Sequence, residues 1–322
     1  MYAIQARAAG GPDVLERVQL DDPTPRPGAM VVELAAAGLN FVDTYQRSGL
    51  YPMSYPAVLG MEGAGTVTAV ADDVTGFSVG DRVAWSGTPG SYAEQVVVPA
   101  DGAVHVPDGV SLEDAAAVML QGMTAQFLVR STFPLEPGNR CLIHAAAGGV
   151  GLLLVQMAKL LGAEVFATVG TAEKAELASG AGADHVIRYR DVDFGDAIVE
   201  LAGPRPIDVV YDGVGASTFL RSLDVIRPRG MMITFGNASG PVEPIAPLAL
   251  SQAGSLFLTR PTLYDHIRTR AELEQRSAEV FRWMAEGRLD VRIGERFALA
   301  DTRKAHEAIE GRATTGKVVL IP

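Results

Sequence analysis

Short runs of β-branched and apolar residues, separated by turn residues, dominate roughly the first 120 positions. The clearest runs lie at residues 31–34, 65–70, 82–85 and 94–98. Turn dipeptides such as Pro27-Gly28 and Gly80-Asp81 bound them. Short strands at this spacing predict a β-rich lobe built as a sandwich or a barrel.

The hydrophobic pattern changes its period after Pro107. Ser111, followed three residues later by Asp114, indicates a helix start with Ser111 as the N-cap. From about residue 140, fully apolar runs alternate with helical stretches, which is typical of buried parallel strands joined by helices. The apolar runs are 141–145, 164–169, 207–211 and 231–235, and the helix candidates are about 150–162, 172–180, 191–202 and 216–226. We therefore expect a parallel sheet wound by helices.

The C-terminal part of the chain predicts one further helix and one strand. The helix runs over about 271–286, with Gly287 as its stop. The strand, at 317–321, is expected to rejoin the β-rich lobe. The predicted domains are therefore a discontinuous first lobe of residues 1–122 and 290–322, and a second lobe of residues 123–289.

A glycine loop follows the first apolar run of the second lobe. Residues 145–151 read Ala-Ala-Ala-Gly-Gly-Val-Gly and precede a predicted helix. Small residues let the backbone approach a pyrophosphate, and the helix N-terminus supplies N–H groups for it. The candidate contacts are Ala147, Gly148, Gly149 and Val150. A small-residue turn that only packs the helix on the strand is the alternative.

The end of the next predicted strand indicates which cofactor binds. Enzymes that bind NAD usually carry an acidic residue there, to hold the ribose 2′-hydroxyl. This chain has Gly170 and Thr171, with Lys174 one helical turn later. Because nothing acidic occupies the strand end itself, a lysine at this place suits a 2′-phosphate, so NADPH is favoured over NADH. Lys174 as a solvated helix residue is the alternative.

Composition narrows the class of protein. The 322 residues are 48% hydrophobic and 20% charged, as expected for a globular chain of two lobes. A formal net charge of −11 disfavours nucleic-acid partners. The sequence shows neither a signal peptide nor a long apolar span, so we expect no membrane association and a cytoplasmic location.

Residues for metal binding or covalent catalysis are scarce. Cys141 is the only cysteine and lies in a predicted buried strand, and the five histidines have no paired spacing. The sequence therefore predicts neither a metal site nor a catalytic nucleophile.

Six segments resemble those of a known family. They are residues 10–15, 38–45, 47–52, 144–151, 170–174 and 235–240. On these segments the chain resembles the medium-chain dehydrogenase/reductase superfamily, and within it the zinc-independent, zeta-crystallin-like quinone oxidoreductases. The resemblance implies an α/β fold with a GroES-like β-rich catalytic lobe and a Rossmann lobe, whose parallel sheet is doubly wound. It also implies NADPH in a cleft between the lobes, and a homodimer.

The resemblance assigns roles to matching positions. In zinc-dependent relatives, a cysteine ligand takes the place of Asn40 and a histidine ligand takes the place of Met61. Because this chain has neither ligand, the resemblance implies that no metal is bound. Asn40 and Tyr51 are the candidate catalytic residues. The further residues implied to contact the cofactor are Tyr45, Thr124, Tyr189, Gly215, Phe235, Gly236, Leu258, Thr259 and Arg312, in addition to Asn40 and Tyr51 themselves.

Each of these roles has a plainer alternative. Asn40 could cap a turn, Tyr45 and Tyr51 could be half-buried aromatics, and Arg312 could be a solvated residue at a helix end.

Three functions remain open at the level of sequence. The first is reduction of a quinone by NADPH without a metal, since an electrophilic acceptor needs positioning more than it needs a Lewis acid. The second is reduction of α,β-unsaturated carbonyls or enoyl thioesters by the same cofactor. The third is a non-catalytic, crystallin-like role that binds NADPH.

Overall fold

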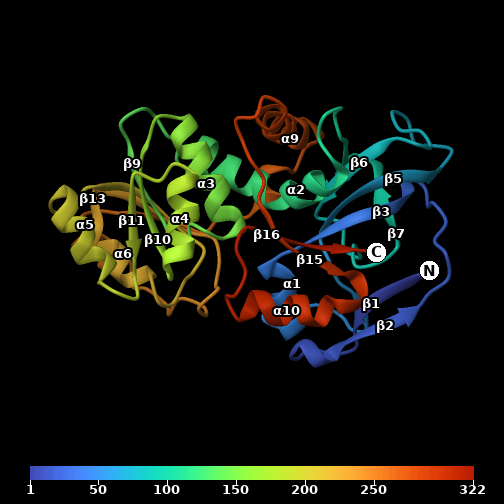
Figure 1. Cartoon of the computed structure of the whole chain (residues 1–322), viewed down its shortest axis with the longest axis horizontal. Coiled ribbons are helices and arrows are strands. Elements are labelled where there is room, and N and C mark those ends of the chain that lie inside the picture. Colours follow the sequence, from blue (N-terminus) through green and yellow to red (C-terminus); the bar gives the residue numbers. More distant parts are fainter. The chain divides into compact units, whose positions relative to one another are not determined.

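The computed structural model describes residues 1–322, which divide into two units (Figure 1). The first unit comprises Met1–Met123 and Ile267–Pro322, and the second comprises Thr124–His266. Helix α2 (Leu112–Phe127) runs across the boundary. It begins as the sequence predicts, because the Asp114 N–H donates to Ser111 Oγ at 3.0 Å.

The second unit is built on a six-stranded sheet in which every neighbouring pair is parallel. The strand order is β11-β10-β9-β12-β13-β14, the order of a doubly wound Rossmann sheet. The strands are β9 (Arg140–Ile143), β10 (Glu164–Val169), β11 (His185–Arg188), β12 (Ile207–Asp212), β13 (Ile226–Thr234) and β14 (Phe257–Thr259). This confirms the predicted fold class for this lobe.

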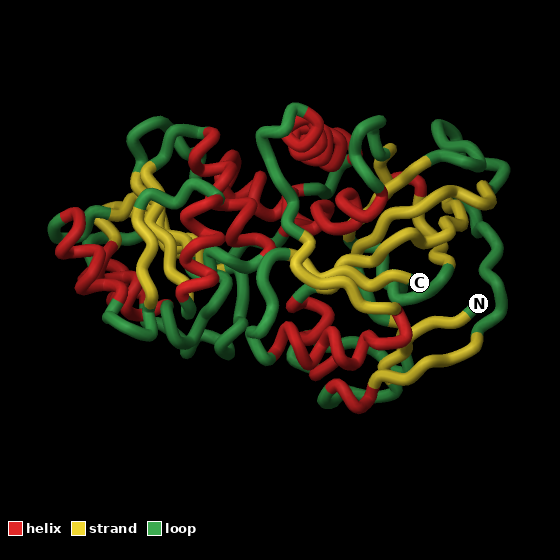
Figure 2. Tube along the Cα trace, in the orientation of Figure 1, coloured by secondary structure: helices red, strands yellow, loops and turns green.

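Helices cover both faces of this sheet (Figure 2). Helices α3 (Gly149–Leu160) and α4 (Ala172–Gly180) pack together, as do α5 (Phe194–Ala202) and α6 (Phe219–Val225). The remaining short elements are a π-helical turn (Leu128–Thr132), α7 (Pro247–Gln252) and α8 (Leu263–His266). Because both faces are covered, the strands carry buried side chains on each side, and Phe166, Phe219 and Met232 lie in the core.

The first unit is β-rich, as predicted. Its main sheet has the order β15-β16-β3-β5-β6-β8, with β7 also paired to β3. These strands are β3 (Ala29–Leu39), β5 (Glu62–Val70), β6 (Arg82–Ser86), β7 (Gln95–Pro99), β8 (Ala103–His105), β15 (Ile293–Ala298) and β16 (Lys317–Ile321). A smaller sheet joins β1 (Tyr2–Ala6), β2 (Leu15–Gln19) and β4 (Ala57–Val58). Trp85, Leu39 and Met30 lie in the core.

The helical elements of this unit are few. They are η1 (Pro12–Val14), α1 (Phe41–Ser48), η2 (Ala100–Gly102), α9 (Arg270–Ala285), η4 (Leu299–Asp301) and α10 (Thr302–Glu310). Strand β16 pairs antiparallel with β3, and Figure 1 shows the red β16 beside the blue β3. The predicted return of the C-terminal strand to the first lobe is therefore confirmed.

Helix α9 belongs to the first unit, whereas the sequence-based boundary at residues 289 and 290 put it in the second. The contacts of Arg270 give the physical reason. Its Nη1 donates to the carbonyl oxygens of Ala100 and Asp101 at 3.3 and 3.4 Å, and also to that of Ala103. The second crossing between the units thus falls before α9. No helix in the structure is long and apolar enough to cross a membrane.

Candidate nucleotide and acceptor site

The carboxyl ends of the six parallel strands define the candidate nucleotide edge of the second unit. The strand order reverses between β9 and β12, and ligands of open α/β sheets bind beyond the strand ends at such a point. The residues predicted in this unit for the cofactor lie at or just beyond these ends, apart from Thr124. They are Ala147–Val150 after β9, Gly170, Thr171 and Lys174 after β10, Tyr189 after β11, Gly215 after β12, Phe235 and Gly236 after β13, and Leu258 and Thr259 in β14.

The loop after β9 turns sharply into helix α3. Ala145 has a φ of 52°, in the left-handed region, and Gly148 is the N-cap of α3. A Cβ atom on Gly151 would collide with the Ala145 carbonyl oxygen, so only glycine allows the helix to lie this close to the loop. No side chain caps α3, so no cap competes with an anion for the N–H groups of its first turn.

A buried histidine holds the base of this loop. His144 Nδ1 lies 2.8 Å from Thr168 Oγ1, and its Nε2 lies 2.8 Å from Ser222 Oγ. Ser222 Oγ donates to the Thr218 carbonyl, so it accepts the proton on Nε2. Burial lowers the pKa of His144, and the ring is neutral. The histidine of the 144–151 segment therefore joins β9, β10 and α6.

The end of β10 is basic and has no acidic side chain at the strand terminus. Thr171 Oγ1 caps α4 by accepting the Lys174 N–H at 3.2 Å, which places Lys174 in the first turn. Tyr189 follows β11, and its N–H donates to the Val169 carbonyl at 3.1 Å. A Cβ atom on Gly170 would lie 2.7 Å from the Tyr189 hydroxyl oxygen, so the glycine makes room for this hydroxyl.

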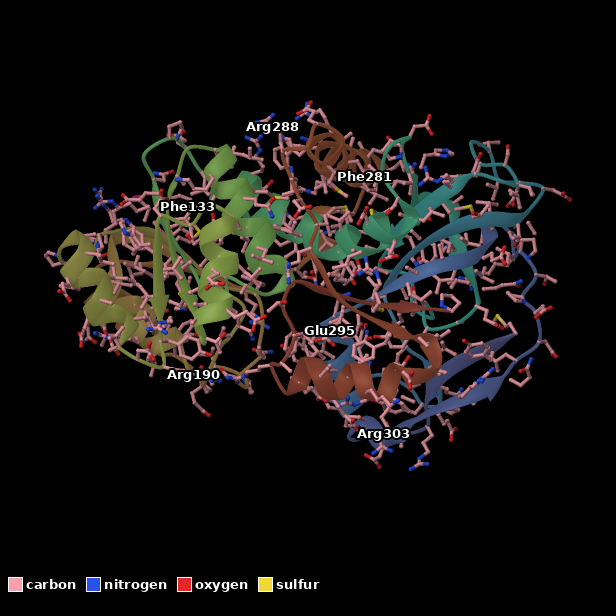
Figure 3. All side chains as sticks on the ribbon, in the orientation of Figure 1. Phe133, Arg190, Phe281, Arg288, Glu295 and Arg303 are labelled. Atoms are coloured by element: carbon pink, nitrogen blue, oxygen red, sulfur yellow. The ribbon has the colours of Figure 1, made fainter.

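Arg190 was missed by the sequence analysis. Its Nε would lie 3.5 Å from a Cβ atom on Gly170, so its guanidinium group lies beside the end of β10. Figure 3 shows Arg190 at the lower edge of this unit. A signal was available, because Arg190 directly follows Tyr189, but β11 was not predicted as a strand. Lys174, Tyr189 and Arg190 thus border one strand end.

Asp212 organises the loop after β12. This carboxylate is fully buried, and its Oδ1 accepts the N–H groups of Val214 and Gly215 at 2.7 and 3.2 Å. Gly215 has a φ of 91°, and a Cβ there would lie 2.6 Å from the Gly240 carbonyl oxygen. Only glycine fits both the backbone angle and the space.

The loop after β13 is held by Arg260. Its Nη1 donates to Thr234 Oγ1 and to the Gly236 carbonyl, each at 3.1 Å. A Cβ on Gly236 would collide with the Gly213 carbonyl oxygen, so the loops after β12 and β13 touch through bare backbone. Together these ends form a glycine-lined edge that fits a dinucleotide, with an uncapped helix for the pyrophosphate and cations near the β10 end.

In the first unit, the predicted residue Asn40 lies in a buried polar cluster. The Asn40 side chain is 3% exposed, and its Oδ1 accepts from Lys317 Nζ at 2.8 Å and from Gln121 Nε2 at 3.0 Å. Its Nδ2 donates to Glu62 Oε1 at 2.7 Å. Asn40 is also the N-cap residue of α1, where its backbone N–H donates to Asp43 Oδ2 at 2.8 Å.

Tyr45 and Tyr51 lie together at the other end of α1. Their rings meet edge to face with centroids 5.3 Å apart, and the Tyr51 N–H donates to the Tyr45 carbonyl at 3.0 Å. Tyr51 is 37% exposed, so its ring is accessible. The structure therefore brings these two predicted residues together, with Tyr45 on the helix that Asn40 begins and Tyr51 in the segment that follows it.

Two further predicted residues lie apart from these groups. Thr124 is buried in α2, at the first position of the second unit. Arg312 is exposed in the first unit after α10, with a φ of 55°. Its predicted contact with the cofactor stays a prediction.

The polar cluster in the first unit does not fit a zinc ion. No group of three or more His, Cys, Asp or Glu side chains in the structure could hold a metal. The Met61 sulfur accepts from Gln46 Nε2 at 3.5 Å, and the Asn40 oxygen faces the Lys317 ammonium group, a cation that would repel a metal.

Comparisons with known proteins agree with this architecture. Residues 26–108 match the alcohol dehydrogenase GroES-like domain, and residues 149–286 match the zinc-binding dehydrogenase family. A quinone oxidoreductase of Pseudomonas aeruginosa is 47% identical over 99% of both chains. A 2-haloacrylate reductase of a Burkholderia species is 41% identical, over 97% of this chain and 96% of its own. The crystal structure of Escherichia coli quinone oxidoreductase complexed with NADPH superposes with a TM-score of 0.98, at 44% identity over the whole of both chains.

The chain combines a GroES-like unit with a Rossmann unit that has a glycine-lined strand edge. This combination defines the class of protein, which is a medium-chain dehydrogenase/reductase. The matches over the full length go further, and the chain belongs to the quinone oxidoreductase family.

Proposed function

We propose that this protein binds NADPH and reduces quinones without a metal. The observation that carries the proposal is the likeness over 99% of the chain to curated quinone oxidoreductases, one of which is the 47% identical relative from Pseudomonas. The chain's own strand ends supply the independent support.

The cofactor part of the proposal rests on the end of β10. NADPH differs from NADH by one phosphate, which needs cations and donors. Lys174 and Arg190 supply positive charge there, Tyr189 supplies a hydroxyl, and Gly170 leaves room for it. A charge-assisted contact of this kind is worth about 1.5–3 kcal/mol, enough to select one cofactor over the other. The family match to an NADPH complex agrees with this choice.

The chemistry needs little from the protein beyond positioning. Bound NADPH supplies a hydride at the nicotinamide ring. A quinone is already electrophilic, so the chain's task is to orient the acceptor and exclude water. We assign the first task to the Tyr45–Tyr51 pair, whose exposed member offers a hydroxyl to an acceptor oxygen.

Reduction of an activated alkene is the second candidate function. The 41% identical 2-haloacrylate reductase favours it, because the same hydride geometry serves a polarised carbon–carbon double bond. The third reading, a non-catalytic protein that binds NADPH, predicts tight binding without turnover.

Steady-state oxidation of NADPH with a panel of quinones, enones and haloacrylates tests these functions. We expect turnover with quinones, undiminished by chelators and with less than one zinc per chain in the active protein. Turnover with alkenes alone would favour the second function. Tight NADPH binding with no turnover on any acceptor would contradict both enzymatic functions.

We also propose a homodimer and a cytoplasmic location. Strand β14 ends the second unit's sheet and exposes 59% of Phe257, so it offers a free edge for pairing with a second copy. Sedimentation equilibrium should give about twice the chain mass of 33.9 kDa. Cell fractionation tests the location.

A further inference from the structure

Four polar residues form a closed cluster beneath the start of helix α1. Glu62, Lys317, Asn40 and Gln121 are 0%, 1%, 3% and 9% exposed. They come from β5, β16, the α1 N-cap and α2, and all lie in the first unit. The antiparallel register pairs Val318 with Leu39, which brings Lys317 opposite Asn40.

A contribution to the stability of the fold does not by itself explain why this polar cluster is buried. Lys317 Nζ donates to Glu62 Oε1, forming an ion pair removed from water. A buried pair loses so much hydration that well-packed apolar residues often serve stability equally well. Buried pairs are retained in some proteins because they set one arrangement rather than another.

The contacts identify what this cluster arranges, namely the Asn40 carboxamide. Lys317 Nζ donates to the Asn40 Oδ1 atom at 2.8 Å, and Glu62 Oε1 accepts from the Asn40 Nδ2 atom at 2.7 Å. The two members of the ion pair therefore bind the oxygen and the nitrogen of the same amide group. Gln121 is a second donor to the oxygen, but its own Oε1 has no partner. Glu62 is held in turn by the Leu120 N–H at 2.6 Å. Lys317 and Glu62 are therefore the cluster residues held most firmly in place, by their ion pair and by the Leu120 N–H.

Helix α1 carries this arrangement to the acceptor side. Asn40 begins the helix, with its N–H bound to Asp43 and its carbonyl accepting the Asp43 N–H at 3.1 Å. Tyr45 lies in the second turn, and its carbonyl accepts the Tyr51 N–H.

We propose that Lys317 is a positioning residue for the reduction step. Through the Asn40 oxygen it holds the start of α1, and thus the Tyr45–Tyr51 pair, in one orientation. This inference rests on the proposed function, since it assigns the acceptor to that pair.

A charge-balanced double variant separates positioning from simple neutralisation. Lys317→Met alone leaves Glu62 buried and unpaired, so the unfolding midpoint should fall. Glu62→Gln combined with Lys317→Met removes both charges and should recover most of that stability. Its Asn40 oxygen still lacks the ammonium donor, so kcat with quinones should stay about tenfold below wild type, the effect of one hydrogen bond. The NADPH dissociation constant should change by less than about twofold.

The matched control is Lys304→Met, because Lys304 is an exposed lysine of the same unit, on α10. It should leave kcat and stability unchanged. A double variant with wild-type kcat would overturn the proposal, because Lys317 would then only neutralise Glu62.

Amide hydrogen exchange over residues 41–48 gives a readout that does not need turnover. Exchange should be faster in the double variant than in wild type, and unchanged in Lys304→Met. If wild type reduces no quinone, the proposed function fails, yet exchange still tests positioning. Unchanged exchange in the double variant would overturn the inference by itself.

Discussion

Lys174 and Arg190 border a strand end that has no acidic terminus. Lys174 lies in the first turn of α4, and Arg190 follows β11, beside Gly170. The two cations come from different elements, so each can contribute separately to a 2′-phosphate site. We therefore expect single residues, rather than the fold, to decide the selectivity between the two cofactors.

Lys174→Ala and Arg190→Ala should each weaken NADPH binding by about ten- to a hundredfold, the worth of one charge-assisted contact. NADH affinity should stay nearly unchanged, because NADH has no 2′-phosphate. Isothermal titration with both cofactors measures this. Arg188→Ala is the control, since Arg188 is an exposed arginine of β11 that pairs with Asp191. Equal losses for NADPH and NADH would contradict the assignment.

Tyr51 is the residue with the most direct predicted role in turnover. Its ring is steadied by Tyr45 while part of it stays exposed. Tyr51→Phe keeps the ring and removes the hydroxyl, so kcat/KM for quinones should fall about tenfold, or ~1.4 kcal/mol. Tyr51→Ala should lower it further. If the Phe variant has wild-type kinetics with every acceptor, the Tyr51 hydroxyl has no role in turnover, and the ring only lines the site.

At the scale of elements, the junction of β10 with α4 contains a helix N-cap residue and a glycine that leaves room for a neighbouring side chain. Thr171 ends the loop by capping α4, and Gly170 gives the Tyr189 hydroxyl room at the strand end. Tyr189 is 42% exposed, so its ring can move if that room is filled. We therefore expect the fold to accept a larger residue at position 170, at the cost of moving the Tyr189 hydroxyl away from the strand end.

Gly170→Ala should fold normally but displace the Tyr189 hydroxyl. We expect NADPH affinity to fall by several-fold to about tenfold, the loss of one hydrogen bond, with little effect on NADH. Gly180→Ala is the control, because Gly180 ends α4 and a Cβ there meets nothing within 4 Å. Thermal melts of both variants should match wild type. A large drop in melting temperature for Gly170→Ala would mean that the glycine serves folding instead.

At the scale of the whole molecule, a buried polar chain ties α1 to α10 within the first unit. Tyr92 donates to Asp43 Oδ2 at 2.9 Å, and its hydroxyl lies 3.4 Å from His306 Nε2. His306 Nδ1 lies 3.1 Å from Arg47 Nη1, and Arg47 pairs with Glu310 at 2.7 Å. Two groups of this hydrogen-bonded series, Asp43 and His306, have pKa values that are shifted in opposite directions.

Burial, aided by the Arg47 charge, lowers the pKa of His306 from 6.5 to about 3. The unfolded chain takes up this proton below pH 6.5 and the folded chain does not, so stability falls as pH drops from 6.5 towards 3. Burial raises the pKa of Asp43 from 3.8 to about 7. The folded chain keeps that proton while the unfolded chain releases it, so stability falls as pH rises from 3.8 to 7.

The two effects should offset each other between about pH 4 and 6.5, each with a limiting slope of about 1.4 kcal/mol per pH unit. His306→Gln removes one of them, so the stability of this variant relative to wild type should decrease as pH rises across that window, by up to about 1.4 kcal/mol per pH unit. Urea unfolding followed by tryptophan fluorescence measures this, since Trp85 and Trp283 both lie in the first unit. His105→Gln, at an exposed histidine, is the control. A variant whose stability depends on pH as wild type does would contradict the assigned shift of His306.

Local patterns determined most of the elements of this protein. The apolar run at 164–169 and the helix at 172–180 coincide with β10 and α4, and the final strand coincides with β16. Such elements are predictable because burial on both faces, caps and glycine loops leave signals within a few neighbouring residues. The glycine loop after β9, and its place before a helix, followed from the same local rules.

Contacts between distant parts of the chain were decided only by the tertiary structure. Neither β14, which is too short to show a period, nor β11, which has no fully apolar run, was predicted as a strand. The pairing of β11 with β10 is what brings Arg190 beside Gly170. Lys317 meets Asn40 across 277 positions because β16 closes onto β3, and no local signal specifies that register. The sequence therefore determined which residues could form a nucleotide edge, whereas sheet pairing decided which buried charges contact Asn40.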